Sequence, residues 1–108
     1  MIMAYNEKLA DAVRELLIGF KDNITEQKMF GGLSFLFKGK MAVGVLKNDL
    51  VVRVVASKME NELEKHNVRP MDFTHKPMKE FIFVEIGDLK ELSHFINLGI
   101  EHARSKLK

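Results

Sequence analysis

Apolar residues recur with two different spacings along this 108-residue chain, and the change of spacing divides it into elements. Over residues 5–20 they return every three or four positions with charged residues between them, which predicts a helix. Short runs rich in β-branched and aromatic residues then predict four strands, at residues 25–30, 33–37, 40–46 and 50–55. The first half of the chain is therefore predicted to be one helix followed by a β-meander.

The second half begins with Ser57 and Glu60, whose spacing has the form of a capping box and predicts a short helix over residues 58–65. Pro70 and Pro77 exclude a helix interior and indicate an ordered loop. Residues 81–86 are predicted to form a strand, and Asp88 begins a last helix over residues 89–105. The order α-β-β-β-β-α-β-α predicts an α+β fold with an antiparallel β-meander and flanking helices, as a single domain over residues 1–108.

Two tight turns, Lys38-Gly39 and Asn48-Asp49, set a register in which Arg53 lies opposite Gly44. One face of the sheet is then predicted to be the core face, and the other is also largely apolar. We expect another segment or a second copy of the chain to cover that other face. The predicted core face holds Leu36, Met41, Val43, Val45, Leu50, Val52 and Val54, and the other face holds Leu33, Phe35, Phe37, Ala42, Gly44, Leu46, Val51, Arg53 and Val55.

Composition removes several classes of chemistry. The chain has no cysteine, which excludes disulfides, thiolate metal sites and cysteine nucleophiles. Its four histidines lack the spacing of a metal site, and Ser34 lacks the motif of an acyl-transfer nucleophile. Gly31-Gly32 is too short for a phosphate loop and is interpreted as a β-bulge or kink. No catalytic residue, metal or cofactor is predicted, and the absence of a signal peptide or an apolar span leads us to expect a cytoplasmic protein without a membrane partner.

Arg53 is the strongest candidate for a binding residue, because this charged residue interrupts an otherwise apolar strand. A guanidinium in such a place usually binds a carboxylate, supplied by an internal acid such as Asp72, by a ligand or by a partner chain. A pocket formed by Arg53, Asp72 and the loop over residues 70–77 is one alternative, and it would serve a small anionic ligand or an enzyme.

Weak nucleic-acid binding is a further alternative, because Phe35, Phe37, Lys38, Lys40 and Arg53 interleave basic and aromatic residues. The RNA-binding sequence pattern is absent and the net charge is only +2, so direct nucleic-acid binding is not favoured.

Two blocks of sequence resemble the N-terminal domain of the TfoX/Sxy family. The first comprises Met29-Phe30-Gly31-Gly32, Phe35, Lys38-Gly39-Lys40-Met41 and Leu50-Val51-Val52-Arg53-Val54, and the second comprises Arg69-Pro70-Met71-Asp72-Phe73-Thr74 and Pro77-Met78-Lys79. The resemblance implies a fold similar to those of YgaC and the secretion chaperones, which often pair as dimers. It also implies a link to regulators of competence for DNA uptake. Those regulators carry a C-terminal helical domain that this sequence does not include, and His75 stands where the family usually has glycine.

The leading hypothesis is a non-enzymatic regulatory or protein-interaction module that forms a homodimer and resembles the N-terminal domain of competence and transcription regulators. The candidate binding residues are Arg53, Phe35, Gly44, Arg69 and Asp72. The residues expected to shape the motif are Met29, Phe30, Gly31, Gly32, Pro70, Met71, Phe73 and Pro77.

Overall fold

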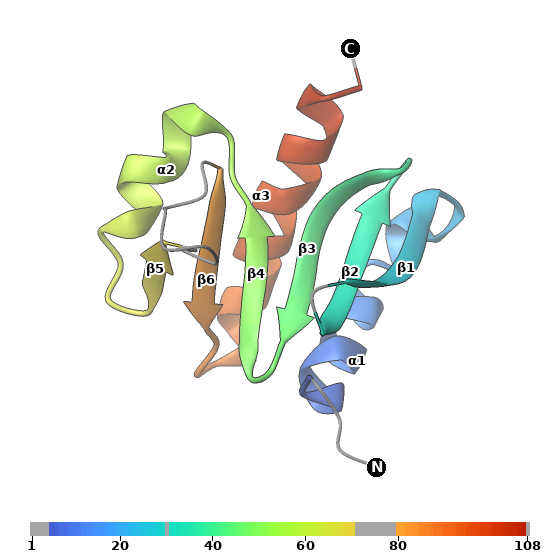
Figure 1. Ribbon diagram of the computed structural model, residues 1–108, viewed down its shortest axis with the longest axis horizontal. Coiled ribbons are helices and arrows are strands. Elements are labelled where there is room, and N and C mark those ends of the chain that lie inside the picture. Colours follow the sequence, from blue (N-terminus) through green and yellow to red (C-terminus); the bar gives the residue numbers. More distant parts are fainter. Residues whose placement is uncertain (1–4, 30, 71–79, 108) are drawn as a thin grey trace.

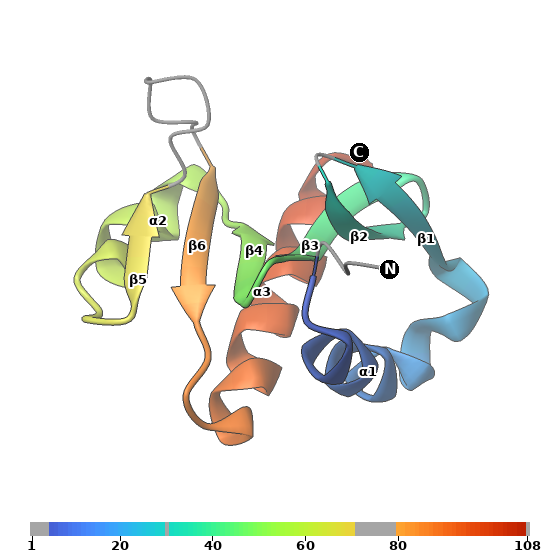
Figure 2. The same cartoon turned by 60° about the horizontal axis from the view of Figure 1, so that its bottom comes forward.

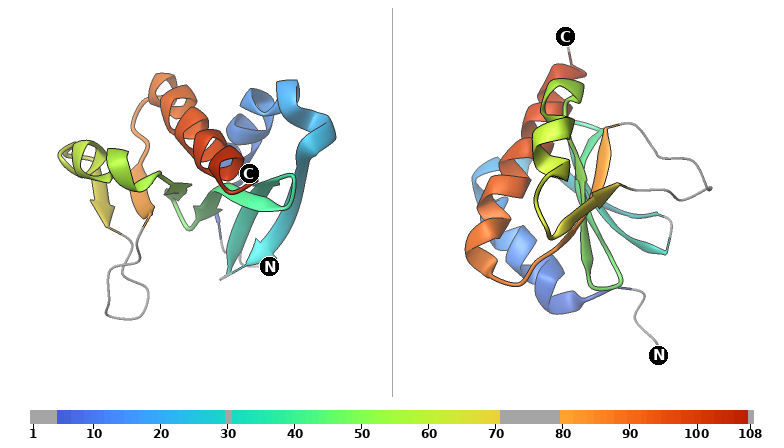
Figure 3. Two further views of the ribbon diagram at one scale, coloured as in Figure 1. Left: turned by 90° about the horizontal axis from the view of Figure 1, so that it is seen from above. Right: turned by 90° about the vertical axis from the view of Figure 1, so that its left-hand side faces the viewer.

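A computed structural model describes residues 5–29, 31–70 and 80–107 and confirms the α+β class. One antiparallel sheet carries α1 and α3 on the same face, giving two layers (Figure 1 and Figure 3, right). The elements in chain order are α1 (Glu7–Leu16), the 3-10 helix η1 (Ile18–Asn23), β1 (Ile24–Met29), β2 (Gly32–Phe37), β3 (Lys40–Leu46), β4 (Asp49–Arg53), α2 (Ala56–Leu63), β5 (Val68–Pro70), β6 (Phe81–Glu85), the 3-10 helix η2 (Leu89–Glu91) and α3 (Leu92–Ser105).

The six strands lie in the order β1-β2-β3-β4-β6-β5, and each neighbouring pair is antiparallel. The first four strands follow the predicted meander. The short strand β5 was not predicted, since Pro70 lies within it and the segment reads as a loop. Its position beside β6, at the end of the sheet away from β1, makes it an edge strand, where a proline is tolerated (Figure 2).

Two signals for helix beginnings had different outcomes. Asp88 accepts a hydrogen bond from the backbone N–H of Lys90 (2.9 Å) at the start of η2, which leads into α3. The expected cap at Ser57 is wrong, because α2 already begins at Ala56, and its N-cap, Val55, makes no side-chain capping bond. The extended backbone of Val55 therefore sets this start without help from a hydroxyl.

The turns set a register that differs from the expected one in the second hairpin. Lys38 and Gly39 have φ of 50° and 84° and form the predicted two-residue turn. The next turn is Lys47-Asn48, with Lys47 at φ 55°, so Leu46 pairs with Asp49. The prediction of an Asn48-Asp49 turn is therefore wrong by one residue at each end.

This change moves every pairing between β3 and β4 by two positions. Gly44 consequently lies opposite Val51 and not opposite Arg53. Because the shift is even, it leaves each side chain of β4 on its expected face.

A β-bulge between β2 and β3 changes which side chains share a face. Phe35 pairs with Val43 but Leu36 pairs with Met41, so Ala42 is the extra residue. A one-residue slip moves side chains to the opposite face of a sheet. Phe35 therefore lies on the core face with Val43, and Leu36 and Met41 lie on the other face. Val43 is on its predicted face, whereas Phe35, Leu36 and Met41 are on the opposite face from the one predicted.

The Gly31-Gly32 pair is not a bulge. Gly32 is the first residue of β2 and pairs with Met29, while Gly31 has φ 78° in the connection between β1 and β2. A residue with a side chain adopts that φ only at a cost, so glycine is the residue best suited to position 31.

The core lies between the sheet and the helices α1 and α3. Gly99 lets α3 approach β3 closely, because a Cβ there would overlap the carbonyl oxygen of Ala42 and lie 2.7 Å from Cγ1 of Val43. Leu92, Phe95, Ile96, Gly99 and Ala103 recur at helical spacing along α3 and are buried. The core residues shared by the sheet and the helices are Leu9, Ala10, Val13, Leu17, Leu33, Phe35, Phe37, Ala42, Val43, Val45, Leu50, Val52, Val54, Val68, Ile82, Val84, Leu92, Phe95, Ile96, Leu98, Ile100 and Ala103.

The face of the sheet away from the helices carries other residues than expected, because Leu33 and Phe35 lie in the core while Leu36 and Met41 lie on this face. Ser34 and Gly44 pair across β2 and β3 on this face, where Val51 is only 4% exposed. No helix in the described part of the chain is long and apolar enough to cross a membrane.

Candidate functional site

Arg53 lies at the end of β4, where the structure brings it to residues from two other elements. Its guanidinium carbon is 4.1 Å from the centroid of the Phe81 ring, across the β4–β6 pair. Its Nη2 is 3.3 Å from Nε2 of His102 on α3, while its Nε is buried without a hydrogen-bond partner among the described residues. Arg53 therefore connects the end of β4 with α3.

His102 is 1% exposed and stands between Arg53 and Glu80. Its Nε2 is 3.1 Å from Oε1 of Glu80. A neutral imidazole ring carries a hydrogen on only one of its two nitrogens, so the tautomer decides whether Nε2 can donate. The tautomer protonated at Nε2 donates to Glu80 and leaves only a lone pair at the buried Nδ1, which has no partner. The other tautomer would bury an N–H without an acceptor, so we assign the proton to Nε2.

The charges in this cluster act against one another. Burial lowers the pKa of His102, and the positive charge of Arg53 lowers it further against the opposing effect of Glu80. Burial also lowers the pKa of Arg53, against the same carboxylate. The burial of Glu80 would raise its pKa, but Lys106, His102 and Arg53 outweigh this and lower it. The histidine is thus held neutral beside a carboxylate that is held ionised.

The backbone supports the position of Glu80. This residue has φ 65°, an uncommon value for a residue with a side chain, and its carbonyl oxygen accepts a hydrogen bond from the N–H of Val54 (3.0 Å). Lys106 Nζ lies 3.7 Å from Oε1 of Glu80. The cluster made by Arg53, His102, Glu80 and Lys106 holds the C-terminal half of α3 against the ends of β4 and β6.

A second polar cluster joins α2 to α3. Glu62 is 6% exposed, accepts a hydrogen bond from Nζ of Lys65 (2.9 Å), and lies 3.2 Å from Nε2 of His94. Burial would raise the pKa of Glu62, but these two hydrogen bonds outweigh it and lower the pKa. This carboxylate too is used inside the fold.

The other predicted binding residues do not gather around Arg53. Phe35 is fully buried in the core, and Gly44 lies beside Ser34 and the side chain of Met41. Arg69 forms an ion pair with Asp49 (2.6 Å), and its guanidinium carbon is 4.8 Å from the centroid of the Phe83 ring. Of the motif residues, Met29 ends β1, Gly32 begins β2 and Pro70 ends β5. Phe30, Met71, Asp72, Phe73 and Pro77 lie outside the described residues, so the proposed Arg53–Asp72 pair and the loop over residues 70–77 stay predictions.

The basic and aromatic residues do not form the surface that nucleic-acid binding would use. Phe35 is fully buried and Phe37 is 4% exposed, so neither ring is displayed for stacking on a base. The rings of Phe37 and Phe20 instead pack edge to face, with the centroids 5.9 Å apart. The expected display of these aromatic rings is wrong, because the bulge turns Phe35 into the core.

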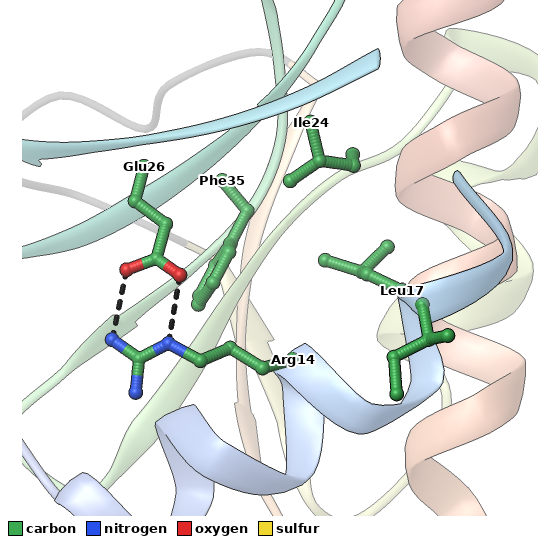
Figure 4. A pocket seen from close by; sticks show the side chains of 6 residues that line it. Arg14, Leu17, Ile24, Glu26 and Phe35 are labelled. Atoms are coloured by element: carbon green, nitrogen blue, oxygen red, sulfur yellow. Dashed lines mark hydrogen bonds and ion pairs between the residues drawn. The ribbon is translucent and has the colours of Figure 1, made fainter. Parts of the chain in front are cut away.

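A pocket that the sequence did not predict lies between α1, η1 and β1, with a volume of about 260 Å³. Phe35, Leu17 and Ile24 form its apolar lining (Figure 4). At one side, Nε and Nη2 of Arg14 donate to the two carboxylate oxygens of Glu26, at 2.7 and 2.8 Å. The Glu26 hydrogen bonds raise the pKa of Arg14, and Arg14 lowers the pKa of Glu26.

Two exposed apolar side chains belong to the pocket lining or lie next to it in the sequence. Ile18, which also lines it, is 64% exposed and Leu16 is 42% exposed. The pocket is smaller than the ~300–1,000 Å³ typical of metabolite sites. An apolar depression with apolar neighbours is better suited to receive a side chain of another protein.

Sequence patterns could have found only part of this region. Ile18 continues the apolar run after Leu17 and falls outside the helical stripe, which is a weak signal of exposure. Arg14 and Glu26 were missed because they belong to different predicted elements, and nothing in their spacing indicates that they meet. Only the packing of α1 against the sheet brings them together.

Within the described residues, no group of three or more histidine, cysteine, aspartate or glutamate side chains is arranged to hold a metal ion.

Among curated proteins no match to the chain was found, and none was found among solved structures. The family model described as the TfoX N-terminal domain matches residues 15–103, which includes every strand of the sheet and most of α3. The chain therefore belongs to the TfoX N-terminal domain family.

Proposed function

We propose that this chain is a non-enzymatic protein-interaction module in a regulatory system, and that it binds its partner through the corner formed by α1, η1 and β1. Membership of the family supports the link to competence and transcription regulators. The observation that carries the proposal is the exposed pair Leu16 and Ile18 beside an apolar pocket. Exposed apolar groups that adjoin a pocket are typical of sites that another protein covers.

The polar clusters around His102 and Glu62 support the non-enzymatic part of this proposal, because both are enclosed within the fold. His102 is buried between Arg53 and Glu80, where a substrate would have no access to its ring. Glu62 is likewise enclosed between α2 and α3. These groups have the pKa shifts of paired structural residues, since each shift arises from burial and from partners inside the fold.

Photo-crosslinking in the cells that express the protein tests this proposal. A photoreactive amino acid is introduced at position 18, and a matched control carries it at position 89, because Leu89 is similarly exposed at 62% but lies at η2. We expect discrete protein adducts from position 18, either to the same chain or to another protein, that position 89 does not give. Equal adducts from both positions, adducts to nucleic acid, or none from position 18 would count against the proposal.

A further inference from the structure

The strand β1 ends the sheet, and no segment within residues 5–29, 31–70 and 80–107 pairs with its outer edge. It has six residues, no proline and an uninterrupted register with β2. The opposite edge strand, β5, has three residues and ends at Pro70. Proteins commonly protect sheet edges by short strands and prolines, so β5 has this protection and β1 lacks it.

The hydrogen-bond pattern shows which backbone groups of β1 point outward. The N–H of Lys38 donates to the carbonyl oxygen of Asn23 (2.7 Å), so these two residues form a hydrogen-bonded pair at the start of the β1–β2 ladder. Such pairs alternate along antiparallel strands. The backbone groups of Thr25 and Gln27 therefore face β2, and those of Ile24, Glu26 and Lys28 face outward.

These outward groups restrict how two copies of β1 can pair as antiparallel strands. Hydrogen bonding requires outward-facing residues to lie opposite one another. A register centred on Glu26 would place two like charges directly opposite each other, and so would one centred on Lys28. The register centred on Gln27 instead places Glu26 of each copy opposite Lys28 of the other, and gives four backbone hydrogen bonds between these residues.

We propose that two copies of this chain pair through the outer edges of β1, antiparallel and centred on Gln27, with Glu26 of each copy opposite Lys28 of the other. This inference rests on the proposed function and names its partner as a second copy. The interface is isologous, because each copy uses the same strand. Strand addition supplies affinity through main-chain hydrogen bonds, and the reciprocal charges select the register.

Two further features favour this pairing. Arg14 binds both carboxylate oxygens of Glu26, so the side chain is ordered before a partner arrives and loses less entropy on binding. A two-fold axis perpendicular to the joined sheets also keeps α1 of both copies on the same side. The α1–η1–β1 corners of the two copies then lie on the same face of the joined sheet.

Charge reversal tests the register directly. Sedimentation equilibrium is measured for the wild-type chain, for Glu26→Lys, for Lys28→Glu and for an equimolar mixture of the two variants. Each variant alone places like charges opposite each other twice, and we expect its dimer dissociation constant to rise about tenfold. The mixture forms a heterodimer in which both pairs are again opposite in sign, so we expect association to return to near the wild-type level.

Controls separate the interface from the fold. Lys90→Glu reverses an exposed lysine on η2, and we expect it to leave the dimer unchanged. Thermal melting of each variant checks the fold, which matters for Glu26→Lys because it also removes the partner of Arg14. The rescue in the mixture is the decisive readout, since a folding defect in either variant would persist there.

The outcomes also distinguish this inference from the proposed function. A wild-type chain that is monomeric at its highest soluble concentration overturns the β1 pairing, and so does a dimer that tolerates both reversals. If position 18 then still gives specific adducts to a different protein, the interaction function stands and a foreign partner occupies the corner. A dimer that both reversals weaken and the mixture restores establishes the register.

Discussion

Arg14 and Arg53 both extend from the sheet or the helix beside it toward a carboxylate, but their surroundings differ. Arg14 is 40% exposed and donates two hydrogen bonds to Glu26, which raise its pKa. Arg53 is partly buried against Phe81 and His102, and burial lowers its pKa. The exposed pair lies where another chain can reach it, whereas the buried cluster fixes α3 in place.

This difference distinguishes the surface around Arg14, which is expected to carry function, from the Arg53 cluster, which is expected to hold the fold in place. Guanidinium groups at exposed sites contribute little to stability, because water screens their charges. A buried guanidinium is different, since removing any of its partners leaves a charge without compensation. A change at the Arg53 cluster should therefore act on the fold, and a change at Arg14 should act mainly on the surface at β1.

Gly99→Ala is expected to have the largest effect, because it separates α3 from the sheet one turn before His102. The new Cβ would overlap the carbonyl oxygen of Ala42, and backbone cannot move aside cheaply. We expect the free energy of unfolding to fall by about 2 kcal/mol, after a helix-propensity gain of roughly 1 kcal/mol is offset. Urea unfolding measures this loss.

Gly99→Ala should also change the surroundings of Arg53 while leaving those of Arg14 unchanged. We expect NMR titration to show the pKa of His102 moving up toward 6.5 as the Arg53 cluster loosens, while the pKa of Glu26 stays low. Gly19→Ala is the matched control, since nothing lies within 4 Å of a Cβ at that position. If Gly99→Ala is destabilised but the pKa of His102 is unchanged, then the Arg53 cluster does not depend on how closely α3 packs against the sheet.

The pH dependence of stability follows from the neutral His102. Its pKa is lowered in the folded chain from an ordinary value of 6.5, so the unfolded chain binds the extra proton first as the pH falls. The stability contribution is present above pH 6.5 and is lost as the pH falls below it, with a slope that approaches about 1.4 kcal/mol per pH unit. Urea unfolding at a series of pH values from 7.5 down to 5 measures this slope.

Two substitutions make that measurement specific. His102→Gln should remove the slope even though it lowers overall stability, and the exposed His66→Gln should retain it. Arg53→Met removes the positive charge beside the ring and should raise the pKa of His102. A slope that survives His102→Gln would assign the pH dependence to other groups.

The sequence was sufficient for most elements because each has its own periodicity. The helical stripe of α3 and the glycine in the Lys38-Gly39 turn each depend on neighbouring residues only. The bulge at Ala42 was not predictable in this way, because both faces of β2 and β3 carry apolar residues and alternation alone does not fix the register. Phe35 was therefore assigned to the wrong face.

The candidate sites show the same limit. Arg53 stood out because a charge interrupts an apolar strand, but its partners Glu80 and His102 are 27 and 49 residues away along the chain. His102 has no local signal for burial, since the charged residues Glu101 and Arg104 lie beside it in the sequence. Contacts of this kind depend on how α3 packs against the sheet, which no local pattern encodes.

Of these substitutions, Arg14→Gln should cause the smallest loss of folding stability. The pair with Glu26 is exposed, and we expect a loss of less than about 1 kcal/mol that shrinks further in high salt. The pKa of Glu26 should rise toward 4.5, because its main hydrogen-bond donor is removed. Urea unfolding at low and high salt measures the loss, with Lys8→Gln on the exposed side of α1 as the control. A larger loss that salt does not reduce would mean that Arg14, like Arg53, acts as part of the core.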